Sequence, residues 1–113
     1  MYDLIIIGGG PAAVGAGVYA ARKKMKTLVI AESFGGQSTV SDKIENWIGD
    51  TEISGFDLGE RLEKHLRAQA DIEIKVGEKA VKVEASNCTD GVRVCDFTVT
   101  IDVILKTSRL ISI

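Results

Sequence analysis

The chain has 113 residues, 45% of them hydrophobic, which suits one modest domain and is short for two. Its 14 basic and 16 acidic residues give a net charge of −2, which argues against a nucleic-acid or anionic-membrane binder. Its apolar runs are far shorter than a membrane span, and its first residues lack the basic region of a signal peptide. We expect a cytoplasmic protein with neither nucleic-acid nor membrane partners, forming a single domain over residues 1–113.

The first residues have the pattern of a buried strand followed by a sharp turn. Asp3–Ile7 contains the run Leu-Ile-Ile-Ile and leaves no polar position there to face water, which is typical of a central parallel strand covered on both faces. Gly8, Gly9 and Gly10 then end the strand. Pro11 suits the first turn of a helix, where a missing N–H is tolerated.

Alanine-rich sequence predicts a helix over Ala12–Lys24. Small residues recur along it at helical spacing and would let it lie close to a sheet: Ala13, Ala16, Gly17 and Ala20. The next apolar run, Thr27–Ala31, predicts a second strand. The opening therefore predicts a strand, a turn, a helix and a parallel strand, joined by the usual right-handed crossover.

A long polar segment separates this unit from a second predicted helix. Glu32–Glu52 has little periodicity and predicts a loop with short helical pieces. Ser54 can cap the second helix, with Asp57 three residues on, and the helix should end near Ala70. One apolar stripe runs along it: Leu58, Leu62 and Leu66.

Alternating apolar and polar residues predict half-buried strands in the last third of the chain. They cover Ile72–Val76, Val81–Val83 and Phe97–Val103, and Asp90-Gly91 suits a hairpin turn between the last two. The fold class is therefore α/β: a Rossmann-like βαβ dinucleotide-binding unit with a parallel sheet, plus a small β-meander.

The glycine turn fits the dinucleotide-binding fingerprint. Gly8 permits the sharp turn, Gly10 lets a pyrophosphate approach the backbone, and Ala13 allows the helix to pack against the strand. Pro11 and Ala12 complete the first helical turn, whose unpaired N–H groups and positive dipole end would bind the anion without a cationic side chain.

Glu32 is the second half of this signal. It directly follows the second predicted strand, about twenty residues beyond the glycines, where a carboxylate can accept hydrogen bonds from both hydroxyls of an adenosine ribose. A 2′-phosphate would meet like charge there. Glycines alone can merely form a turn, but the strand, the helix and the acid together favour dinucleotide binding. The fingerprint leaves FAD and NAD open, because both carry the same adenosine pyrophosphate.

Two further segments resemble a known family. Gly35-Gly36-Gln37 and the run Ile-Glu-Asn-Trp-Ile-Gly at Ile44–Gly49 look like the flavin domain of low-molecular-weight thioredoxin reductases and their alkyl hydroperoxide reductase relatives. The resemblance covers residues 1 to about 85. It implies FAD as the cofactor, with Gln37 and Asn46 as contacts along the ribityl chain and flavin. It also implies that Gly35 and Gly36 allow the backbone to approach the cofactor closely.

The same residues separate related families. Glutathione-reductase-like enzymes would place a cysteine pair near Gln37–Thr39, and ferredoxin-NADP reductases generally lack the element at Glu45–Trp47. Ile48 stands where the resembled family usually has proline. The family's Ala-Thr-Gly strand, NADPH domain, Cys-x-x-Cys and Gly-Asp segment have no counterpart here, so the expected fold is incomplete relative to the family.

The resemblance implies a flavin-dependent oxidoreductase that passes electrons from NADPH through FAD to a disulfide. In the full-length family it also implies a homodimer and a thioredoxin-like partner protein. We assign no catalytic or metal-binding residue, and we expect the isolated chain to be inactive. The alternatives are a non-catalytic module that binds adenine dinucleotides, or the NAD-binding domain of another oxidoreductase.

Other conspicuous residues are interpreted as structural. Cys88 and Cys95 match neither a redox pair nor a zinc ligand set and are expected to be inert reduced thiols. His65 is interpreted as a residue at the edge of the core, and Trp47 as an anchor of its loop. A basic cluster is interpreted as a solvated helix end: Arg22, Lys23, Lys24 and Lys26.

Overall fold

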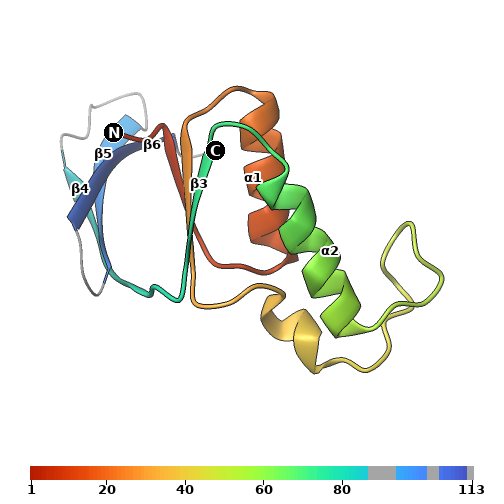
Figure 1. Cartoon of the computed structure of the whole chain (residues 1–113). Helices are drawn as coiled ribbons and strands as arrows, with labels where there is room; N and C mark the ends of the chain where they lie inside the picture. Colours follow the sequence, from red (N-terminus) through yellow and green to blue (C-terminus); the bar gives the residue numbers. More distant parts are fainter. Residues whose placement is uncertain (87–93, 102–104, 112–113) are drawn as a thin grey trace.

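The computed structural model describes residues 1–86, 94–101 and 105–111. Its elements, in chain order, are β1 (Leu4–Ile7), α1 (Pro11–Arg22), β2 (Thr27–Ala31), the 3₁₀ helix η1 (Gly36–Val40), α2 (Gly55–Arg67), β3 (Ile72–Val76), β4 (Ala80–Ser86), β5 (Val94–Ile101) and β6 (Leu105–Ile111). Figure 1 shows three layers: the two α-helices, a sheet of β1, β2 and β3, and a second sheet of β4, β5 and β6. The α/β fold with a parallel sheet and a β-meander is confirmed.

Strand β2 lies at the centre of the parallel sheet. It pairs in parallel with β1 and with β3, and all five of its residues are buried. Strand β1 pairs only with β2 among the described strands, and Ile7 at its end is 50% exposed. The prediction that Asp3–Ile7 is the fully covered central strand is therefore wrong, because β2 has a strand on each side and takes that place.

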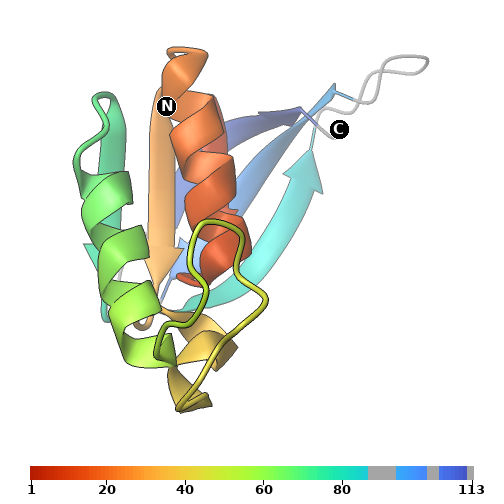
Figure 2. The same ribbon diagram turned by 90° about the vertical axis from the view of Figure 1, so that its right-hand side faces the viewer.

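The side chains of β2 alternate between two separate cores. Leu28 and Ile30 point toward the meander, where they pack with Tyr2, Ile5, Val99 and Ile101. Val29 points the other way, toward the helices, and packs with Ile6, Val14 and Leu66. This follows from the two-residue period of a strand, which sends neighbouring side chains to opposite faces. Figure 2 shows α1 and α2 side by side over one face of the sheet.

Helix α1 uses a different face from the predicted one. Val14, Gly17 and Ala20 are buried, whereas Ala16 is exposed. The helix ends at Arg22, and Lys24 takes a left-handed conformation with φ 57°. Spacings of three and four select neighbours on a helix, but they do not fix which of several small faces meets the sheet.

Helix α2 begins as predicted. The Ser54 Oγ accepts a hydrogen bond from the backbone N–H of Asp57 at 3.0 Å and donates one to the Asp57 carboxylate at 2.7 Å. The helix ends at Arg67, before the predicted end near Ala70. Leu58 and Leu66 are buried in the expected stripe, and Leu62 is half-buried. Neither this helix nor any other in the described part of the chain is long and apolar enough to cross a membrane.

The meander pairs β4 with β5 and β5 with β6, both antiparallel. Val81 and Val83 are exposed, against the predicted burial of that face, because β4 is an edge strand of this sheet. The predicted Asp90-Gly91 turn and Cys88 lie outside the described residues. So does Val103, the predicted end of the last strand.

Two glycines of α1 give a matched test of this packing. A Cβ at Gly17 would lie 2.5 Å from Leu66 Cδ1, which belongs to a fully buried side chain, whereas a Cβ at Gly15 would meet nothing within 4 Å. Gly15→Ala should raise the free energy of unfolding by about 0.5–1 kcal/mol, because alanine is the better helix former. Gly17→Ala should be less stable than Gly15→Ala by about 1–3 kcal/mol through overpacking.

Urea unfolding of both variants, followed by circular dichroism, measures this difference. Equal stability of the two would show that α1 does not pack against Leu66 as described.

Candidate functional site

The glycine turn after β1 is tied to the neighbouring strand and loop. The Gly8 N–H donates to the Ile30 carbonyl at 2.8 Å, and Gly8 has a φ of +125°, which favours glycine. A side chain at Gly9 would collide with the Ser33 carbonyl, and the Gly9 carbonyl accepts a hydrogen bond from the Gly35 N–H at 2.9 Å. The sequence interpretation assigns Gly9 no role, because the fingerprint leaves that position unspecified. The contact with Ser33 is not local in sequence.

The N-terminus of α1 has the features of an anion-binding site. Gly10 is its N-cap and provides no side-chain hydrogen bond, Pro11 lies in the first turn, and that turn contains no acidic residue. The N–H groups of the first turn, which includes Ala12 and Ala13, therefore have no capping side chain. Such groups, together with the positive end of the helix dipole, bind phosphate or carboxylate groups.

The Gly-Gly-Gln segment lies against this turn. A Cβ at Gly36 would be 3.1 Å from Gly10 Cα, so the two backbones approach closely and leave little room for side chains between them. Gly35 and Gly36 both have positive φ values, +93° and +55°. Gln37, in the first turn of η1, is exposed. The structure therefore brings Gly36 to the predicted pyrophosphate position and leaves the Gln37 side chain in solvent.

Glu32 shares a cavity with the glycine turn. The cavity has a volume of about 300 Å³, and its lining includes Gly8, Gly9, Glu32 and Lys79. The Gly77 N–H donates to the carbonyl of Ala31 at 2.9 Å, which brings the connection between β3 and β4 to the end of β2. The two halves of the fingerprint, distant in sequence, therefore border one cavity.

A lysine that sequence reasoning missed faces the acid. The Lys79 Nζ lies 3.3 Å from the Glu32 Oε1, and the two side chains are 66% and 62% exposed. Lys79 belongs to the connection between β3 and β4, far from Glu32 along the chain, and no motif marks it. Only the parallel pairing of β3 with β2 brings the two residues together.

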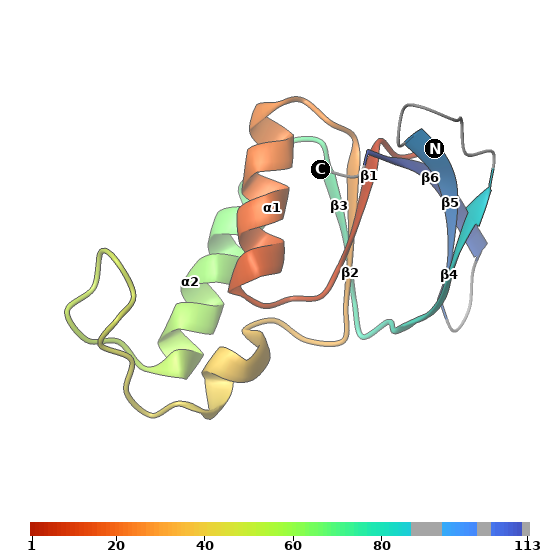
Figure 3. The ribbon, with the colours of Figure 1, turned by 180° about the vertical axis from the view of Figure 1, so that it is seen from behind.

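The other predicted flavin contact lies on a separate loop. An antiparallel bridge between Ile44 and Ile53 closes this loop, with N–H to carbonyl distances of 2.8 and 2.9 Å. Asn46 is exposed and borders a hollow formed by residues 45–51, away from the residues that line the Glu32 cavity. Figure 3 shows the loop projecting beyond α2, away from the sheets. In this structure, Asn46 and Glu32 therefore do not border one cavity.

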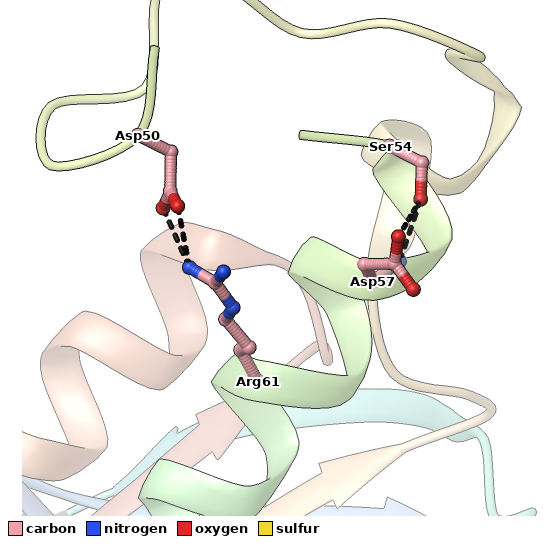
Figure 4. A network of polar contacts seen from close by, with 4 residues as sticks. All are labelled: Asp50, Ser54, Asp57 and Arg61. Carbon is pink, nitrogen blue, oxygen red and sulfur yellow. Dashed lines mark hydrogen bonds and ion pairs between the residues drawn. The ribbon is translucent and has the colours of Figure 1, made fainter. Parts of the chain in front are cut away.

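Ion pairs hold the loop in place. The Arg61 guanidinium donates to both carboxylate oxygens of Asp50 at 2.7 Å, beside the Ser54 cap of α2 (Figure 4). The Lys43 ammonium lies 2.8 Å from the Glu45 carboxylate and 3.1 Å from that of Glu52, and these carboxylates raise the pKa of Lys43.

Three structural interpretations can be compared with these positions. Trp47 is 36% exposed and lies outside both hydrophobic cores, so its predicted anchoring role is wrong; Ile53, 6% exposed, is the buried residue of this loop. His65 is exposed instead of lying at the edge of the core. The predicted solvated helix end is confirmed, because its members are exposed: Arg22, Lys23, Lys24 and Lys26.

Comparison with known proteins agrees with this arrangement. The family described as pyridine nucleotide-disulphide oxidoreductase matches residues 2–105. Alkyl hydroperoxide reductase F of Staphylococcus epidermidis is 38% identical over 86 residues, which cover 76% of this chain and 17% of that protein. The protein of the same name from Xanthomonas campestris pv. phaseoli is 47% identical over 73 residues, covering 65% of this chain and 14% of that protein.

A solved structure has the same fold. The crystal structure of Lactococcus lactis thioredoxin reductase matches with a TM-score of 0.84 at 27% identity, over 96% of this chain and 33% of that one. The chain therefore spans well under half the length of each of these proteins. The predicted resemblance to thioredoxin reductases and their alkyl hydroperoxide reductase relatives is confirmed.

The glycine turn yields a direct test. A Cβ at Gly10 would have only Gly36 Cα within 4 Å, at 3.8 Å, and Gly10 has an ordinary φ of −80°, so the fold should tolerate a side chain. Gly10→Val should nevertheless abolish binding of adenosine diphosphate, because the branched side chain would occupy the approach to the helix N-terminus.

Titration calorimetry measures the binding, and circular dichroism checks the fold. Gly15→Val, in the same helix but with open space around its Cβ, is the control and should bind as the parent does. Retained affinity in Gly10→Val would mean that the glycines only form a turn.

Proposed function

Because the chain belongs to the pyridine nucleotide-disulphide oxidoreductase family, we propose that residues 1–113 form a single, partial FAD-binding domain. The observation that carries this proposal is the shared cavity. One wall is the glycine turn that leads into the uncapped N-terminus of α1, and another is the carboxylate of Glu32. An anion site beside a ribose-binding acid matches the adenosine pyrophosphate of a dinucleotide.

The residues divide the adenosine half of the ligand between them. The pyrophosphate approaches the backbone of the first helical turn, from Gly10 through Pro11 and Ala12 to Ala13, without meeting a side chain at Gly8 or Gly10. The ribose hydroxyls donate hydrogen bonds to Glu32. This division uses backbone dipoles for the phosphates and one charged acceptor for the sugar.

The flavin half is assigned to a second group of residues. Gly36 lies against Gly10, so a ligand that follows the glycine turn passes the Gly35–Gln37 segment next. The Gln37 amide and, from the projecting loop, the Asn46 amide are proposed to contact the ribityl chain and flavin. Both side chains are exposed and so are accessible to a ligand.

The activity belongs to a longer protein. Bound FAD supplies the electron-transfer chemistry, and this chain's residues bind and orient it. By analogy with proteins named thioredoxin reductase and alkyl hydroperoxide reductase F, we propose that electrons pass from NADPH through FAD to a disulfide. A homodimer and a thioredoxin-like partner are proposals for that longer protein, and the cytoplasmic location stays a prediction.

A second candidate is a non-catalytic module that binds only the adenosine part of a dinucleotide. The observation in its favour is that Gln37 and Asn46 are exposed and lie outside the lining of the Glu32 cavity. The absorbance spectrum of the purified protein separates the two candidates, because bound oxidised flavin is yellow and adenine nucleotides are colourless. Competition between FAD and NAD tests the remaining alternative, an NAD-binding domain.

Glu32→Ala should weaken binding of FAD and adenosine diphosphate alike. The charge-assisted hydrogen bonds to the ribose are worth about 1.5–3 kcal/mol, and both ligands carry the same ribose. Glu84→Ala is a matched control, because Glu84 is an exposed glutamate paired with Lys82 at 2.9 Å, outside the cavity lining. Titration calorimetry with both ligands measures the effect, and unchanged affinity in Glu32→Ala would remove Glu32 from the site.

FAD and adenosine diphosphate should bind the 113-residue chain with affinities that agree within about tenfold, or roughly 1.4 kcal/mol. The exposed Gln37 and Asn46 side chains do not enclose a flavin, so the adenosine and pyrophosphate contacts should dominate. Competition titrations measure the ratio. Purification of the chain with stoichiometric yellow flavin would contradict this expectation.

A further inference from the structure

The charges around the Glu32 cavity cancel. Two carboxylates contribute to its lining, those of Glu32 and Glu78, and each has a lysine beside it. The Lys79 ammonium lies 3.3 Å from Glu32, and the Lys75 ammonium lies 3.5 Å from Glu78. A nucleotide entering the cavity therefore meets paired charges instead of isolated negative ones.

We propose that Lys79 is a specificity-determining residue of this cavity: it lets the site accept adenosine whose ribose carries a 2′-phosphate as well as adenosine with a free ribose diol. The inference rests on the proposed nucleotide site and deepens it. From the sequence, Glu32 alone predicts repulsion of a 2′-phosphate. In the structure, the positive charge of Lys79 offsets that repulsion at the position where the ribose would bind.

Lys79 has the chemistry and the freedom that this role requires. An ammonium group has three donor hydrogens, and within the described part of the chain Lys79 forms an ion pair with Glu32 alone. Its side chain is 66% exposed, so it can turn toward a phosphate without a large desolvation cost. Lysine binds phosphate as a flexible point charge, which suits a group at the rim of a cavity.

The test compares two ligands that differ only in the 2′-phosphate, NAD⁺ and NADP⁺. In the parent chain, the two dissociation constants should agree within about tenfold. Lys79→Gln should raise the ratio of the NADP⁺ constant to the NAD⁺ constant by about five- to tenfold, because the phosphate loses one charged donor and meets Glu32 without compensation. Binding of NAD⁺ should change little.

Lys82→Gln is the matched control. Lys82 is also an exposed lysine paired with a glutamate, at 2.9 Å from Glu84, and it lies outside the cavity lining. The control removes the same charge from the chain, so it corrects for the change in overall field. The ratio should be unchanged in Lys82→Gln, and circular dichroism checks that both variants fold.

Two failures can be told apart by titrating adenosine diphosphate alongside. If the diphosphate binds but Lys79→Gln changes the ratio no more than Lys82→Gln does, the role of Lys79 is refuted and the nucleotide site stands. Rejection of NADP⁺ by more than about a hundredfold in the parent chain would refute it as well. If none of the nucleotides binds, the proposed site itself fails, and this inference fails with it.

Discussion

The close approach of Gly9 to Ser33 is the constraint on which the site depends. The space between them admits no side chain, and the neighbouring hydrogen bond from the Gly35 N–H to the Gly9 carbonyl joins the same two segments. Glu32 and Gly36 flank this junction and so are held beside the glycine turn. Because both contacts use backbone atoms, the placement does not depend on side-chain rotamers.

The central strand holds the acid from the other side. Strand β2 supplies Leu28 and Ile30 to one core and Val29 to the other, so one five-residue strand couples the helices to the meander. The residue that follows it is Glu32. A functional side chain placed at the end of such a strand inherits its rigidity, which is why the carboxyl ends of parallel strands so often carry binding groups.

The local features of this fold could be predicted from the sequence, and the tertiary ones could not. The glycine turn and the Ser54 cap depend on neighbours a few residues apart, and both are predicted correctly. Periodicity places Ala16 and Val83 on buried faces, but they are exposed, because burial depends on which other element covers a face. Lys79 escapes prediction because it meets Glu32 only through strand pairing.

The loop over residues 41–53 is held in a different way from the rest of the molecule. Its connection to α2 is the pair of Asp50 and Arg61, its two sides are joined by Lys43 with Glu45 and Glu52, and most of these side chains are exposed. Such contacts are screened by salt, whereas the two hydrophobic cores are not. The loop is therefore a low-stability unit that can open on its own. Its amide hydrogens would exchange with solvent through that opening, while those of β2 exchange only when the whole domain unfolds.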